Sequence, residues 1–103
     1  MVEQQELRAE RPDFVHQYTR DIEPATILAI ESLSLADVVI IEAGYENGYR
    51  GGMPCTVFRA GRPIAEILLV EVRPQISAAT IESLVPGYSI EPGDRIRPRI
   101  SRS

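Results

Sequence analysis

The stretch that decides the fold class is residues 55–73, which read CTVFRAGRPIAEILLVEVR. It contains two apolar segments, residues 55–59 and residues 64–73, separated by a short turn at Gly61. β-Branched residues, which fit a pleated surface, occur in both segments, and glycine supplies the positive φ that a tight turn requires. Both faces of the longer segment carry apolar side chains, so we expect a long strand that two parts of a curved sheet share.

Four further segments, on either side of this stretch, have the length and composition of strands. They are residues 25–31, 37–43, 77–84 and 95–100. For residues 76–84 strand and helix both remain open, because alanine favours helices, and the surrounding strands favour a strand. Pro98 marks the last segment as a sheet edge or a strand end. Six short segments with turns between them predict an all-β fold, a small SH3-like barrel.

Glycines interrupt the chain where these segments must be connected. The predicted structural turn positions are Gly44, Gly48, Gly52, Gly61, Gly87, Gly93 and Asp94. Asn47-Gly48 is a strong turn dipeptide, because both residues tolerate positive φ. Asp94 is expected to hydrogen-bond within its own turn. The glycine-rich residues 44–54 match no phosphate-binding fingerprint, so we interpret them as a tight corner.

The first 24 residues differ in character from the rest of the chain. They are polar and acidic, and Pro12 ends any helix that begins near Glu3. We therefore predict a mostly irregular or short-helical arm (1–24), a barrel domain (25–99) and a short tail (100–103). Phe14, Val15 and Tyr18 are candidates for attaching the arm to the barrel; the alternative is an arm that reaches a neighbouring subunit or an upstream segment.

The charge of the chain is acidic overall and basic at its C-terminal end. The formal net charge is −4, which disfavours a general nucleic-acid binder. All basic residues are arginines, and the candidates for contact with an anion or a partner are Arg95, Arg97, Arg99 and Arg102. They leave open a second reading, a small-barrel nucleic-acid-binding domain in which Tyr45, Tyr49 or Tyr88 would stack on bases.

No pattern of residues points to catalysis, to a cofactor or to a metal. Cys55 is the only cysteine and His16 the only histidine, and they lie far apart without a third orienting group. Glu66 and Glu71 fall on opposite faces of their strand, so they are not expected to face each other. No segment reaches the roughly 18 apolar residues of a membrane span. We expect no catalytic, cofactor or metal site and no membrane span.

The order of corners and strands resembles a known domain. A strand ends at Gly44, a loop contains Gly48, and Gly52 precedes a strand. After these come the turn at Gly61, the long strand, a strand led by Ser77, and Gly93-Asp94-Arg95. With this pattern residues 25–98 resemble the small C-terminal β-barrel of the flagellar assembly protein T family and, more loosely, the β-domains of the rod-shape-determining MreC family. Met53 departs from the first family, whose members often have an acidic residue there. The resemblance implies a bacterial, envelope-associated module that helps an assembly form, and it implies no catalytic residues.

The expected function is therefore a non-enzymatic structural or interaction module, part of a larger bacterial envelope or assembly protein. A protein partner or self-association is expected, and nucleic acid is disfavoured. If the chain is a fragment of an exported protein, its location is the periplasm or the envelope. The sequence leaves open the partner and the oligomeric state.

Overall fold

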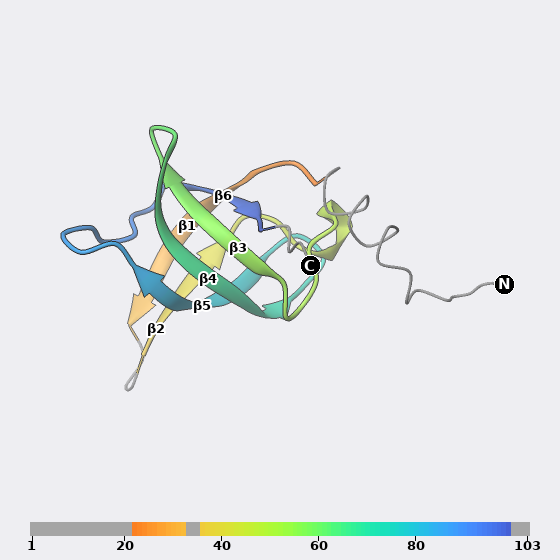
Figure 1. Cartoon of the computed structure of the whole chain (residues 1–103). Helices are drawn as coiled ribbons and strands as arrows, with labels where there is room; N and C mark the ends of the chain where they lie inside the picture. Colours follow the sequence, from red (N-terminus) through yellow and green to blue (C-terminus); the bar gives the residue numbers. More distant parts are fainter. Residues whose placement is uncertain (1–21, 33–35, 100–103) are drawn as a thin grey trace, which may run out of the picture.

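The computed structural model describes residues 22–32 and 36–99. In them six strands form one closed antiparallel barrel in the order β1-β2-β5-β4-β3-β6 (Figure 1). The strands are β1 (Ala25–Ser32), β2 (Asp37–Ile41), β3 (Pro54–Arg59), β4 (Arg62–Val72), β5 (Ser77–Leu84) and β6 (Arg95–Pro98). The predicted all-β barrel of six short strands is confirmed, and residues 77–84 form a strand. Most of the predicted arm, residues 1–21, and the tail lie outside the described residues.

The strand order contains a Greek key. Strands β3, β4 and β5 follow one another as antiparallel neighbours, and β6 returns to pair with β3. Strand β1 closes the barrel by pairing with β2 on one side and β6 on the other. A closed barrel has no sheet edge, so Pro98 marks a strand end, the second of the two expected roles.

Four β-bulges bend the strands into the barrel. The extra residues are Leu28 in β1, Ile64 and Val70 in β4, and Glu82 in β5. A bulge bends its strand and increases the local twist, which helps a sheet to close on itself. The bulge at Val70 also interrupts the alternation of β4, so Glu71 is exposed on the outside of the barrel, as Glu66 partly is. The expectation that these two carboxylates lie on opposite faces is therefore wrong.

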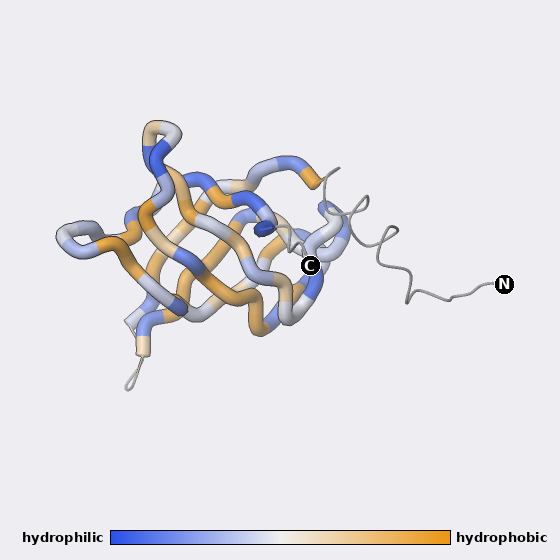
Figure 2. Tube along the Cα trace, in the orientation of Figure 1, coloured by the Kyte–Doolittle hydropathy of each residue, from blue (hydrophilic) through white to orange (hydrophobic). Residues whose placement is uncertain are grey.

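The interior is filled by the alternate residues of each strand, and hydrophobic positions recur along the strands in Figure 2. The largest fully buried side chains are Tyr49, Ile27, Ile41, Ile64, Ile67, Leu69, Ile96, Val39, Val57 and Cys55. Burial of each large aliphatic side chain contributes roughly 1.5–3 kcal/mol to folding. Cys55 is one of these core residues, and burial raises the pKa of its thiol to about 12. At neutral pH the thiol is therefore protonated and shielded from solvent.

A single 3₁₀ turn, η1 (Tyr45–Asn47), shapes the corner between β2 and β3. The Asn47 side chain accepts a hydrogen bond of 2.9 Å from the Gly44 amide. Gly48 has positive φ, at 97°, and Asn47 does not. The Asn47-Gly48 dipeptide therefore ends the 3₁₀ turn and does not form a turn with two positive φ values. The Tyr49 hydroxyl donates a hydrogen bond of 2.7 Å to the Glu23 carbonyl. This bond attaches the segment that leads into β1 to the corner.

No helix in the described part of the chain is long and apolar enough to cross a membrane.

Candidate functional site

Strand β6 places two of the predicted arginines side by side on the outside of the barrel. Ile96 points into the core and is fully buried, so its neighbours Arg95 and Arg97 point outward. Arg95 lies opposite Phe58 of β3, and Arg97 lies opposite Thr56. Because side chains two residues apart on a strand share a face, the two guanidinium groups rise from one surface.

Phe58 supplies the aromatic part of this surface. Cys55 and Val57 face the core, so the alternation of β3 turns Phe58 outward, where it is half-buried. The Arg97 guanidinium carbon lies 5.9 Å from the centroid of the Phe58 ring, within cation–π range. A hollow of about 310 Å³ adjoins them, lined by Pro24, Phe58, Gly61, Arg95 and Arg97. We call these five residues the arginine site.

The charges of the arginine site are not neutralised by the described part of the barrel. Within residues 22–32 and 36–99, no carboxylate forms an ion pair with Arg95 or Arg97. Arg99 differs, because its Nη1 lies 3.4 Å from Glu66 Oε1, and Glu66 also accepts a hydrogen bond from Thr56. Arg102 lies outside the described residues. The structure therefore brings together two of the four predicted arginines.

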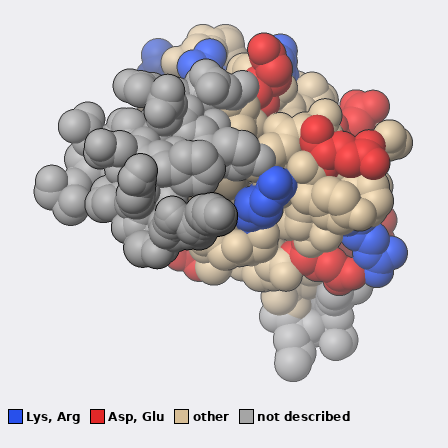
Figure 3. All heavy atoms as spheres, turned by 90° about the vertical axis from the view of Figure 1, so that its right-hand side faces the viewer, with Lys and Arg blue, Asp and Glu red and all other residues tan. Residues whose placement is uncertain are grey.

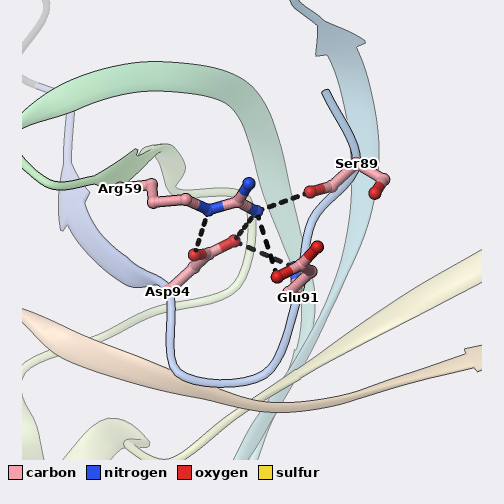
Figure 4. A network of polar contacts seen from close by, with 4 residues as sticks. All are labelled: Arg59, Ser89, Glu91 and Asp94. Carbon is pink, nitrogen blue, oxygen red and sulfur yellow. Dashed lines mark hydrogen bonds and ion pairs between the residues drawn. The ribbon is translucent and has the colours of Figure 1, made fainter. Parts of the chain in front are cut away.

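A second polar cluster, at Arg59 and Asp94, serves the fold (Figure 4). Arg59 Nε and Nη2 donate to the two carboxylate oxygens of Asp94 at 2.9 and 2.8 Å, and Nη2 also donates to the Ser89 carbonyl at 2.6 Å. Asp94 Oδ2 accepts from the Glu91 amide at 2.9 Å, which is the hydrogen bond within its own turn that the sequence suggested. The loop between β5 and β6 is thereby attached to the end of β3.

The hydrogen bond from Arg59 lowers the pKa of Asp94 below its usual range, and the Glu91 amide acts in the same direction. The Asp94 side chain is almost fully buried, with 6% of its surface exposed, so its charge depends on these donors. The Asp94 backbone also pairs with β1, since its carbonyl accepts from the Ile27 amide at 2.8 Å. Asp94 thus joins β1, β3 and the start of β6.

The predicted glycines serve two different purposes. The ones with positive φ are Gly48, Gly52, Gly61, Gly87 and Gly93. Gly44 has an extended backbone with φ of −148° and is needed for another reason. A Cβ atom there would lie 1.8 Å from the Arg73 carbonyl oxygen, so only glycine allows the two backbones to approach.

The tyrosines suggested as stacking platforms do not surround the arginine site. Tyr49 is 1% exposed, so its role as a stacking surface is ruled out. The Tyr88 ring lies 5.9 Å from the Arg59 guanidinium carbon, and the exposed Tyr45 belongs to η1. The aromatic residue at the site is Phe58, which the sequence analysis missed. Strict alternation from the buried Cys55 and Val57 was the signal that could have identified it.

Between the outward carboxylates Glu66 and Glu71 of β4, part of the outer surface of β2, β4 and β5 carries uncharged side chains, most of them apolar. Its residues are Val38, Ile40, Leu68, Val70, Ala78 and Thr80, which are neighbours across the paired strands apart from the bulged Val70. Val70 is 54% exposed, and none of the six carries a charge. We call this surface the outer apolar face. A small hollow of about 170 Å³ lies beside it, between Ile40, Ile76 and Arg73.

Fold and site together define a small closed β-barrel with an arginine-lined surface. Among the described residues, no group of three or more histidine, cysteine or carboxylate side chains is arranged to hold a metal ion. Comparisons of the chain with models of protein families, with curated proteins and with solved structures found no match.

Proposed function

We propose that the chain is a non-enzymatic structural or interaction module that contacts a protein partner through the arginine site. The observation that carries this proposal is the pair of exposed guanidinium groups, Arg95 and Arg97, beside Phe58 and an open hollow. Arginine and aromatic residues are enriched at the centres of protein interfaces, where they contribute most of the binding energy. The outer apolar face is a second exposed surface that supports the same class of function.

The environments of the reactive side chains support a non-enzymatic role. The Cys55 thiol is buried in the core, with its pKa raised to about 12, so it is not available as a thiolate. The Asp94 carboxylate is held by Arg59, and the Glu66 carboxylate contacts Arg99 and Thr56. These groups stabilise the barrel, which leaves the arginine site and the outer apolar face as the surfaces available for recognition.

The place of the module, in a larger bacterial envelope or assembly protein, is the part of the proposal that rests on resemblance. That resemblance is to the small C-terminal β-barrel of the flagellar assembly protein T family and, more loosely, to the β-domains of the rod-shape-determining MreC family. A fold alone does not carry a function, so the envelope or assembly role stays a prediction.

The alternative, a nucleic-acid-binding domain, has less support from the arrangement of charges. Nonspecific binders contact many phosphates, and each contact requires a cation that is not already paired. Arg99 is shared with Glu66 and Arg59 with Asp94. On the face that Figure 3 shows, acidic and basic side chains are scattered among uncharged ones. The net charge of −4 adds long-range repulsion of a polyanion.

Site-specific photo-crosslinking in the cells that produce the protein tests this function. A benzophenone amino acid replaces Phe58 in the full-length product, and the matched control carries it at Tyr45, which is exposed on η1. We expect protease-sensitive, nuclease-resistant adducts at position 58 that are absent or weaker at position 45. No adduct at position 58, or an adduct that nuclease removes, would contradict the proposal.

A further inference from the structure

We infer that the arginine site binds an extended acidic peptide whose carboxylates lie on alternate residues. This inference rests on the proposed function and names the chemistry of the partner. The site lies outside the Arg59–Asp94 cluster, so occupying it does not disturb the contacts that hold the barrel together.

The spacing of the two arginines favours a peptide in an extended conformation. Arg95 and Arg97 are separated by one residue of β6, so their backbone positions are about 6.5 Å apart. Residues i and i+2 of an extended peptide have the same separation and also share a face. Each carboxylate of such a peptide can therefore meet one guanidinium group, and guanidinium–carboxylate pairs are among the strongest hydrogen-bonded pairs in proteins.

The hollow beside the arginines supplies room for a third residue. Pro24 and the half-buried Phe58 give it an apolar wall, and Gly61 contributes no side chain that would fill it. The next residue on the same face of the peptide can place a small apolar side chain there. The expected ligand therefore has two acidic residues at i and i+2 and an apolar residue two positions before or after them.

The number of charges at the arginine site favours a short peptide with two carboxylates over a nucleic acid with many phosphates. Two guanidinium groups match two carboxylates, and Phe58 holds the Arg97 guanidinium by a cation–π contact. Glu66 borders the site, because it pairs with Thr56 of β3, which lies opposite Arg97, and its carboxylate contacts Arg99. A nucleic acid of several nucleotides extends past the two arginines and would place further phosphates near that carboxylate, whereas the peptide brings only the two negative charges that the arginines pair with.

Fluorescence anisotropy with the complete 103-residue chain tests the inference. The probe is a labelled peptide, Val-Ser-Asp-Ser-Asp-Ser-Val, and its controls replace both aspartates by asparagine or place them next to each other. We expect binding that weakens at least tenfold with either control peptide and with Arg97→Gln, the loss of one charge-assisted pair. Arg73→Gln is the matched control, because Arg73 is exposed on another part of the surface and pairs with Glu71. It should leave binding unchanged, and urea midpoints should show that both variants remain folded.

Three results would overturn the inference. The first is a failure of the aspartate peptide to bind at low salt, and the second is equal binding by Arg97→Gln. The third is tighter binding of an eight-nucleotide oligothymidylate than of the peptide. If position 58 still crosslinks to protein in cells when the peptide fails, the proposed function stands and only this inference is wrong. If neither the crosslink nor the peptide complex forms, both are wrong.

Discussion

Replacing Gly44 with alanine tests the close approach of two backbones at the corner of the barrel. The added Cβ would lie 1.8 Å from the Arg73 carbonyl oxygen and 2.7 Å from the Pro74 carbonyl. Ordinary contacts between carbon and oxygen are about 3.3 Å or longer, so the two backbones must separate by about 1.5 Å. The hydrogen bonds from Tyr45 to Arg73 (2.9 Å) and from Glu46 to Pro74 (3.0 Å) cannot survive this shift.

The expected loss of stability follows from these contacts. Two lost hydrogen bonds cost about 1 kcal/mol each, and overpacking of a close contact costs about 1–3 kcal/mol more. The total is about 3–5 kcal/mol, a large share of the roughly 5–15 kcal/mol that holds a domain together. With a urea slope of about 1–1.5 kcal/mol per M, the midpoint should fall by about 2–5 M.

Gly51→Ala is the matched control for this substitution. No atom lies within 4 Å of a Cβ at Gly51, and its φ is not positive. Alanine there reduces only the entropy of the unfolded chain, so it should raise stability by up to about 1 kcal/mol. Urea unfolding followed by tyrosine fluorescence and circular dichroism measures both variants, since the chain has 4 tyrosines and no tryptophan. Equal midpoints for the two variants would refute the steric argument.

Three further substitutions or measurements test other contacts. Asp94→Asn should lower the urea midpoint at pH 7 and should make the midpoint fall less steeply on acidification. The pKa of Asp94 is lower in the folded chain than in the unfolded chain, so ionised Asp94 stabilises the fold above about pH 4, and this stabilisation is lost as the pH falls through the folded pKa. Ala60→Asn should stabilise the barrel by about 1 kcal/mol. Ala60 has a φ of 53°, a left-handed conformation, beside Gly61 in the two-residue β3–β4 turn, and asparagine tolerates that conformation better than alanine. Native Cys55 should not react with a thiol reagent at pH 8 within minutes, because its thiol is buried and its pKa is about 12.

Each of these has an outcome that contradicts it. For Asp94→Asn it is a midpoint that depends on pH as steeply as that of the unsubstituted chain. For Ala60→Asn it is an unchanged or lower urea midpoint. For Cys55 it is a reaction in buffer as fast as the reaction in concentrated urea, where the unfolded chain exposes the thiol.

The positions of the strands could be predicted because the signals for them are local. β-Branched residues, apolar alternation and glycine or proline at the ends placed all six strands to within about two residues. Local turn chemistry also predicted that the Asp94 side chain would hydrogen-bond within its own turn. In the structure the Asp94 carboxylate accepts this hydrogen bond from the Glu91 amide. The outward direction of Arg95 and Arg97 follows from the same alternation around Ile96.

Other features depend on residues that are distant in the sequence and adjacent in space. The strand order, the closure and the four bulges arise from pairing across the whole chain, which local patterns do not encode. The bulge at Val70 reversed the expected side of Glu71, and a chain separation of 35 residues hid the pairing of Arg59 with Asp94. In the sequence Gly44 was interpreted as a turn residue. Glycine is required there because the Arg73 carbonyl oxygen, on another segment, leaves no room for a Cβ atom.

The sequence alone therefore determined a six-stranded β domain and nominated four C-terminal arginines, because strand periodicity and local charge are properties of a single segment. Only the tertiary structure decided which side chains meet. Pairing of β3 with β6 brought Phe58 to Arg95 and Arg97, and the segment at Pro24 completed the hollow beside them. That surface consists of three parts of the chain, and its members come together only when the barrel closes.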